Sequence, residues 1–189
     1  MNKDELMTKF IDIYTTYIKR EGSDVLLDYL KKSDFFIAPA SSKYHNNCEG
    51  GLVDHSINVY ESLKNLNDKL ELGFNDESIA IVGLLHDVCK IDFYKIEYRN
   101  RKNEETGKWE KYPFYSVDEK FPFGHSEKSC YIIQSMMKLT REECLAIRGH
   151  MGAWDKDPTL TSNIFEISKL ALYTHFADLI ASKTIETTY

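Results

Sequence analysis

The stretch Ile79-Ala80-Ile81-Val82-Gly83-Leu84-Leu85-His86-Asp87 decides the fold. Its first seven residues are almost all apolar and follow Asn75-Asp76, a helix-capping signal, so they predict a helix buried on every side. A histidine and an aspartate at the end of such a helix are costly to bury unless a metal ion or another partner compensates them. The stretch therefore predicts a helical core with a polar site at the end of its central helix.

Helical patterns continue on both sides of this segment. Apolar residues recur at three- and four-residue spacing from Leu6 to Ile18, and Gly22 ends that pattern. The segment 33–51 is mixed in composition and is expected to be an ordered loop. A loop with Trp154 and Pro158 is expected before the last helix. The further helices are expected at about 24–32, 52–66, 76–85, 126–137, 141–148 and 163–185. Thr140-Arg141-Glu142-Glu143 resembles a capping box before the helix that ends at Arg148.

Between about residues 91 and 123 the helical pattern gives way to alternation. Lys95, Glu97 and Arg99 alternate with aromatic and aliphatic side chains, and aromatic residues return after the charged turn 105–108. This predicts a β-hairpin insertion with a charged tip. Because both of its ends join segments that carry candidate metal ligands, the hairpin is expected to determine substrate specificity. The fold class is thus all-α, a helical bundle bearing one hairpin.

Length and charge limit the kind of protein this is. A chain of 189 residues, 42% of them hydrophobic, suits one domain: helices over 1–38, a metal-binding helical core over 39–187, and the hairpin at about 91–123. A net charge of −6 gives no basic field for long nucleic acid, which favours a small substrate. No signal peptide and no run of about 20 apolar residues is seen, so we expect a cytoplasmic protein without a membrane segment.

The four cysteines are widely spaced and form no CxxC pair, so we expect reduced thiols. They are Cys48, Cys89, Cys130 and Cys144. Cys89 follows His86-Asp87 closely and in principle reaches a metal, but in a continuous helix it projects away from them. Helix packing is the interpretation we favour for Cys89.

Histidines and aspartates in separated segments provide the candidate chemistry. A single histidine is more often packed or solvated than a ligand. Here, however, the aspartates lie in apolar surroundings, and imidazole with carboxylate is a ligand set suited to divalent transition metals. The candidate ligands are His55, His86, Asp87, His125, His150 and Asp178.

In order and context, His55, His86-Asp87 and Asp178 resemble the motif of the HD-domain metal-dependent phosphohydrolase superfamily. His125 and His150 resemble the second-metal ligands of its binuclear branch. The resemblance implies an HD-domain helical bundle holding two divalent ions, with iron or manganese favoured over nickel, zinc, cobalt or magnesium. The segment 43–55 also resembles part of the HD domain of bacterial 3′-to-5′ exoribonucleases, although Asn46 replaces one histidine of that group.

The resemblance implies a phosphohydrolase that cleaves a phosphate ester of a nucleotide or similar small molecule through a metal-activated hydroxide. Asp87 is expected to bridge the two metals. Lys90 completes the His-Asp-x-x-Lys form in which the lysine contacts a substrate phosphate. A solvated lysine at a helix end is the alternative for Lys90.

Four further residues are candidates for substrate binding. Lys128 and Arg148 are expected to clamp phosphate oxygens, with surface charge as the alternative for both. His45 is expected to orient substrate or a ligand, and Trp154 to stack on a base, with aromatic packing as its alternative. His175 is expected to be structural.

Two other functions stay open at this point. The binuclear pattern resembles phosphodiesterases that act on cyclic or short oligonucleotides, and the superfamily also includes an oxygenase with a similar di-iron site. A non-catalytic, metal-stabilised binding or regulatory module belongs to a different class. Six ligands favour an enzyme over such a module.

Overall fold

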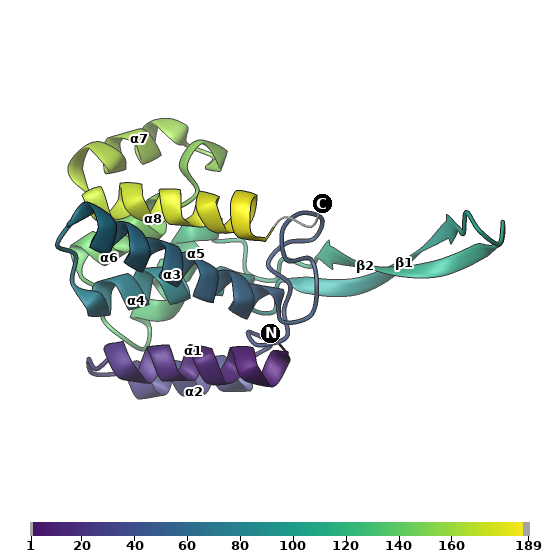
Figure 1. Cartoon of the computed structure of the whole chain (residues 1–189), viewed down its shortest axis with the longest axis horizontal. Helices are drawn as coiled ribbons and strands as arrows, with labels where there is room; N and C mark the ends of the chain where they lie inside the picture. Colours follow the sequence, from purple (N-terminus) through teal and green to yellow (C-terminus); the bar gives the residue numbers. More distant parts are fainter. Residues whose placement is uncertain (1, 187–189) are drawn as a thin grey trace.

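The structure, a computed structural model in which residues 2–186 are described, is a helical bundle from which one long hairpin projects (Figure 1). Short 3₁₀ turns lie at Val88–Lys90 and Gly152–Trp154, and a π-helical turn at Ala181–Ile185 follows the last helix. The α-helices within the described residues are α1 (Lys3–Tyr17), α2 (Ser23–Lys32), α3 (Gly51–Leu70), α4 (Asp76–Leu85), α5 (His125–Gln134), α6 (Arg141–Gly149), α7 (Pro158–Ile167) and α8 (Lys169–Ile180).

Helix α4 lies inside the bundle, as its sequence predicts. Every residue from Ile79 to Leu85 is buried, and α4 packs against α1, α3 and α6. Helix α3 in turn packs against α8. At Gly83 a Cβ atom would lie only 2.6 Å from Tyr60 Cα, so the glycine allows α3 and α4 to approach closely. These contacts hold the end of α4 in the middle of the bundle.

The helix starts follow local signals in the sequence. Asn75 Oδ1 accepts hydrogen bonds from the backbone N–H groups of Glu77 and Ser78. Thr140 and Glu143 form the capping box that the sequence predicts at the start of α6. Side-chain caps of this kind satisfy backbone donors that a helix start leaves unpaired.

A buried ion pair connects the N-terminal helices to the core. The guanidinium of Arg20, in the segment between α1 and α2, donates to both carboxylate oxygens of Glu143 at 2.7 and 2.8 Å and to Glu77 at 3.1 Å. Ser78 Oγ also donates to Glu143. Glu143 is fully buried, and its partners come from three different segments, so this carboxylate fixes the relative position of α1, α4 and α6.

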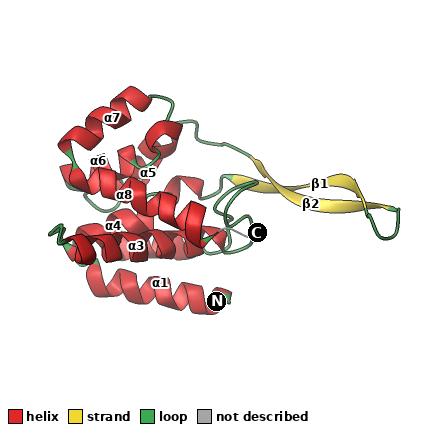
Figure 2. Ribbon diagram, turned by 45° about the horizontal axis from the view of Figure 1, so that its top comes forward, coloured by secondary structure: helices red, strands yellow, loops and turns green. Residues whose placement is uncertain are grey.

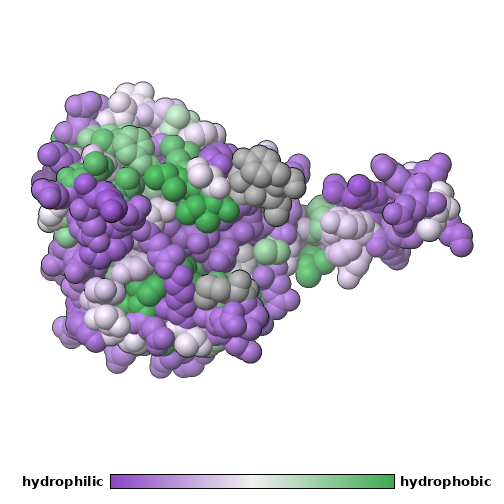
Figure 3. All heavy atoms as spheres, in the orientation of Figure 1, coloured by the Kyte–Doolittle hydropathy of each residue, from purple (hydrophilic) through white to green (hydrophobic). Residues whose placement is uncertain are grey.

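The predicted hairpin is confirmed. Strands β1 (Tyr94–Lys102) and β2 (Trp109–Val117) pair antiparallel, with Tyr94 opposite Val117 at the base and Lys102 opposite Trp109 near the tip. Figure 2 shows the pair as a twisted ribbon extending away from the helices. In Figure 3 the outer end of the hairpin is hydrophilic, whereas apolar surface appears near its base.

The prediction of one long helix at 163–185 after a loop at Pro158 is wrong. Helix α7 already begins at Pro158, behind Asp157, whose side chain accepts from Leu160 N. The helix is interrupted at Ser168, where φ is −134° and ψ is 106°. Ser168 Oγ caps α8 at Ala171 N and donates to Glu142, so a tertiary contact stabilises the break.

Other boundaries differ by a few residues. Helix α3 runs to Leu70 rather than to about residue 66, and α5 ends at Gln134 rather than near residue 137. Within residues 2–186, no helix combines the length and apolar character needed to cross a bilayer.

Candidate metal centre

The six predicted ligands converge on one pocket. His55 lies in the first turns of α3, His86-Asp87 directly after α4, His125 at the start of α5, His150 just after α6, and Asp178 near the end of α8. Five of them line a cavity of about 510 Å³, called here the metal pocket, and His86 is fully buried beside it. The cavity is lined by Ala40, Ser41, Ser42, Tyr44, His45, His55, Asp87, Lys90, Tyr94, His125, His150, Met151, Trp154, His175, Asp178, Leu179, Ser182 and Lys183.

Asp87 stands between two pairs of histidines. Its Oδ2 atom lies 3.6 Å from His55 Nε2 and 3.5 Å from His86 Nε2. Its Oδ1 atom lies 2.8 Å from His125 Nε2 and 3.5 Å from His150 Nε2. The carboxylate therefore turns one oxygen toward each pair.

Hydrogen bonds on the outer side fix which nitrogen of each ring faces the pocket. His86 Nδ1 lies 3.0 Å from Gly83 O, and His150 Nδ1 lies 2.7 Å from Ile147 O. Because a carbonyl oxygen only accepts, both Nδ1 atoms carry a proton, and both rings turn Nε2, the nitrogen that can bind a metal ion, inward. His55 Nδ1 is held in the same way by Glu186, at 3.0 and 3.1 Å.

These inward nitrogen atoms fit a cation. His55 Nε2 and His86 Nε2 are 3.2 Å apart, and two lone pairs at that distance repel each other unless a proton or a metal ion lies between them. His150 Nε2 is buried without a hydrogen-bond partner within residues 2–186. Sets of three donor atoms lie within 4.8 Å of one another, among them His55, His86 and Asp178. Such imidazole and carboxylate donors suit a divalent transition metal.

The electrostatics of the pocket also favour a positive charge. Burial opposes a charge on His55, but Asp178 and Glu186 raise its pKa to about 10. Burial lowers the pKa of His86 to about 3. Burial also disfavours the ionised form of Asp87, yet Lys90 and the histidines hold its pKa well below the usual range. The carboxylates are thus ionised, and His55 binds a proton where a metal ion would otherwise provide the charge.

Cys89 is buried, as the packing interpretation expects, and its thiol also lies beside the candidate ligands. Its Sγ atom is 3.4 Å from His125 Nδ1, and Cys89, Asp87 and His125 form another set of close donor atoms. Helix α4 ends at Leu85, and Asp87 has φ −108° and ψ 17° before the 3₁₀ turn. Because the helix is not continuous, the side-chain directions of an α-helix do not apply to Cys89.

Three predicted substrate residues lie in the metal pocket. Lys90 Nζ is 2.6 Å from Asp87 Oδ2. The His45 ring lies 4.9 Å from the ring of His55, and its Nε2 atom is buried without a hydrogen-bond partner among the described residues. Trp154 is largely exposed and lines the pocket. The positions of these three side chains are compatible with contacts to a bound substrate.

The structure does not bring Lys128 and Arg148 to this pocket. Lys128 pairs with Glu119 at 3.0 Å and is buried. Arg148 pairs with Glu127 at 2.8 Å and Asp155 at 2.7 Å. Because both cations are already paired with carboxylates, Lys128 and Arg148 are no longer assigned to a substrate phosphate.

His175 has a supporting role in the geometry. Its Nδ1 atom donates to the backbone oxygen of His150 at 2.7 Å, and its ring stacks on Phe165. The hydrogen bond fixes the backbone of a candidate metal ligand.

The sequence analysis missed three residues of this region. Glu186 is buried against His55 and also accepts from Asn58 at 3.1 Å. Tyr94 and Lys183 line the metal pocket. None of the three lies in a motif, and only the position of Tyr94 at the base of the predicted hairpin gave a local signal.

Comparisons with known proteins agree with this geometry. The HD domain, as a protein family, matches residues 52–182. A dihydroneopterin 2′,3′-cyclic phosphate phosphodiesterase from Methanocaldococcus jannaschii is 33% identical over 85 residues, which cover 43% of this chain and 31% of the relative. The similarity thus spans about a third of that relative's length. No solved structure gave a significant match.

Proposed function

The chain belongs to the HD-domain family, and on that premise we propose that it is a metal-dependent hydrolase of small phosphate esters. The arrangement around Asp87 is the observation that carries this proposal. One oxygen of the carboxylate faces His55 and His86, and the other faces His125 and His150. A single carboxylate placed in this way can offer one oxygen to each of two cations.

We further propose two divalent ions that share Asp87. The donor sets lie on opposite sides of this carboxylate and come from different helices. One set is His55, His86 and Asp178. The other is His125 and His150, which both face Asp87 Oδ1, with the thiol of Cys89 close to His125. Imidazole-rich ligation favours iron, manganese or a neighbouring transition metal over magnesium, which prefers oxygen donors.

When bound, such ions supply Lewis acidity toward phosphoryl oxygens and activate a water molecule. The chain itself supplies the binding groups. Lys183 is exposed at the metal pocket and forms no ion pair within residues 2–186, so its ammonium is free to contact a phosphate oxygen. Burial opposes a charge on Lys90, but Asp87 raises its pKa, so a second positive charge lies at the pocket wall. Trp154 offers a flat apolar surface at the same opening.

A phosphodiester is the favoured form of the substrate. The relative from Methanocaldococcus jannaschii is named as a phosphodiesterase of a cyclic phosphate. A diester carries one negative charge, which matches the one lysine of the metal pocket without a carboxylate partner among residues 2–186, Lys183, because Lys90 is paired with Asp87. Hydrolysis of a phosphomonoester of a nucleotide is the second candidate.

Metal analysis combined with hydrolysis assays tests the proposal. Purified protein should contain divalent metal and should hydrolyse bis(p-nitrophenyl) phosphate faster than p-nitrophenyl phosphate. His86→Ala and Asp87→Asn should lose both metal and activity, whereas Asp28→Asn, a surface aspartate of α2, should retain both. Folding of each variant is checked by circular dichroism.

The outcomes separate the candidate functions. Metal binding without hydrolysis of either ester or of a nucleotide panel would indicate the non-catalytic, metal-stabilised module. Protein that binds no divalent metal under anaerobic loading would overturn the proposal altogether.

A further inference from the structure

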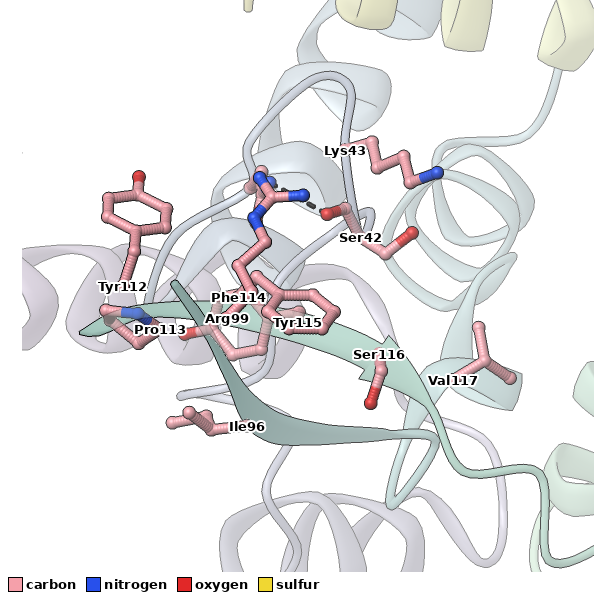
Figure 4. A pocket seen from close by; sticks show the side chains of 11 residues that line it. Ser42, Lys43, Ile96, Arg99, Tyr112, Pro113, Phe114, Tyr115, Ser116 and Val117 are labelled. Atoms are coloured by element: carbon pink, nitrogen blue, oxygen red, sulfur yellow. Dashed lines mark hydrogen bonds between the residues drawn. The ribbon is translucent and has the colours of Figure 1, made fainter. Parts of the chain in front are cut away.

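A second cavity lies beside the metal pocket, at the base of the hairpin. It has a volume of about 960 Å³ and is lined by Ser42, Lys43 and Asn47 from the loop before α3 and by Ile96, Arg99 and Tyr112–Val117 from the hairpin. We call it the hairpin pocket. In Figure 4 the Arg99 side chain extends from the hairpin toward the loop that carries Ser42 and Lys43.

The two pockets are neighbours. Ser42 lines both of them. Tyr94, at the wall of the metal pocket, contacts Tyr115 of the hairpin pocket with ring centroids 6.4 Å apart. The loop is held in place because Asn47 Nδ2 donates to Ser42 O at 2.9 Å. A ligand longer than a simple phosphate ester can therefore extend from one pocket to the other past Ser42.

The charge of the hairpin pocket is unusual for this protein. Its lining contains two cations, Lys43 and Arg99, and no carboxylate, although the chain as a whole carries a net charge of −6. Among residues 2–186, no carboxylate forms an ion pair with either side chain. By contrast, Arg20 and Arg148 are each paired with two carboxylates. An arginine and a lysine without carboxylate partners in an acidic protein leave a local positive charge that attracts an anion.

The walls of the hairpin pocket are aromatic. The Arg99 guanidinium lies over the ring of Phe114 at 5.1 Å and over that of Tyr112 at 5.9 Å. Stacking of this kind keeps the guanidinium plane fixed while its N–H groups stay available for hydrogen bonds. Planar side chains beside cations are the combination that binds a base and its phosphate.

We propose that the hairpin pocket binds a second nucleotide unit of the substrate, while the phosphodiester that is cleaved lies in the metal pocket. This inference rests on the proposed function and narrows its substrate class to dinucleotides and short oligonucleotides. Arg99 and Lys43 contact the distal phosphate, and the aromatic wall of β2 stacks on the distal base. The hairpin base thus determines the length of substrate that is preferred.

Steady-state kinetics on two diesters test the inference. A 5′-phosphorylated dinucleotide such as pApA is long enough to reach both pockets, whereas bis(p-nitrophenyl) phosphate is a small ester that has no second phosphate. Arg99→Gln and Lys43→Gln should each raise KM for the dinucleotide about tenfold and change KM for the small ester less than twofold. Arg101→Gln is the matched control, because Arg101 also lies over Tyr112 but does not line the hairpin pocket.

Binding without turnover separates a failure of this inference from a failure of the proposed function. Isothermal titration of metal-free protein with pApA should give a dissociation constant that rises about tenfold in Arg99→Gln and stays unchanged in Arg101→Gln. This result would support the hairpin pocket even if no ester were hydrolysed. Equal effects of Arg99→Gln on both esters, or an unchanged KM and affinity for pApA, would overturn the inference.

Discussion

Glu186 provides the sharpest test of how the metal centre is built. Its carboxylate is buried, with both oxygens within hydrogen-bond distance of His55 Nδ1, at 3.0 and 3.1 Å. Asn58 Nδ2 donates to the same carboxylate at 3.1 Å. A carboxylate bound to the outer nitrogen of a ligating histidine fixes the ring and makes the inner nitrogen a stronger donor. We therefore expect Glu186→Gln to weaken metal binding without removing any metal ligand.

The magnitude follows from the charge that is lost. A hydrogen bond to a charged group contributes about 1.5–3 kcal/mol, and a neutral one about half of that. Because the glutamine amide oxygen still accepts from His55 Nδ1, the expected loss is about 1.4 kcal/mol, or about tenfold in affinity. Glu186→Ala removes the acceptor as well, and about a hundredfold loss is expected, at the upper end of the range for such outer contacts.

The expected loss depends on pH. The pKa of His55 is raised to about 10, against the effect of burial, by Asp178 and Glu186, so a metal ion must displace a proton from His55 at neutral pH. Glu186→Gln should lower the pKa of His55, so it weakens the binding of the competing proton as well as the binding of the metal ion. The loss in apparent affinity should consequently be smaller at pH 6.5 than at pH 8.5.

A competitive chelator titration with Mn²⁺ at both pH values measures this effect. Glu142→Gln is the control, since Glu142 is a carboxylate that binds Ser168 away from the metal pocket. If the Mn²⁺ affinity of Glu186→Gln, corrected for the proton displaced from His55, lay within twofold of the wild-type value, while His86→Ala lost the metal, the reasoning would be refuted.

Three other perturbations give distinct readouts. Burial opposes the ionised form of Glu143, but its hydrogen bonds lower its pKa. The stability that the ionised carboxylate contributes is present above the unfolded pKa of about 4.3 and is lost as pH falls. The free energy of unfolding of Glu143→Gln, measured with urea, should therefore depend less on pH in the acid range than that of the wild-type protein. Cys89→Ser should reduce affinity for zinc and cobalt more than for manganese and remove any thiolate-to-cobalt absorption, whereas Cys130→Ser should change neither, because a thiolate is a soft donor. Gly83→Ala should lower the free energy of unfolding by about 3 kcal/mol, since the new Cβ would lie 2.6 Å from the backbone of Tyr60; a loss under about 1 kcal/mol would show that α3 and α4 separate easily.

Local signals explain why much of this structure was predictable. The apolar run of α4, the cap at Asn75 and the capping box at Thr140 each act within a few residues, and each forms as expected. Alternation of side chains likewise gave the hairpin. His86, Asp87 and Asp178 drew notice because histidine and aspartate are out of place in apolar segments unless something compensates them. His125 and His150 were assigned from the resemblance to the binuclear branch of the superfamily.

The remaining features depend on contacts between distant segments. Ser168 is a favoured helix-capping residue and caps α8 at Ala171 N, but its other hydrogen bond, to Glu142 of α6, joins segments far apart in the sequence. Arg148 was predicted to bind phosphate, but the fold places Glu127 and Asp155 beside it, and these ion pairs could not be read from the local sequence. Glu186 carries no local signal, since a glutamate near the end of a chain is usually solvated.

The candidate ligands on the two sides of Asp87 differ in how firmly their segments are packed in the bundle. His55, His86 and Asp178 lie on or directly after α3, α4 and α8, and α3 packs against both of the others. His125, in contrast, begins α5 directly after the segment that returns from the hairpin, and 30% of its side chain is exposed. His150, on the same side of Asp87, is buried like His55 and His86, so His125 is the candidate ligand most exposed to the opening. If the hairpin pocket holds the distal part of a substrate, as proposed, the segment from Val117 to His125 is the direct covalent connection between that pocket and this ligand.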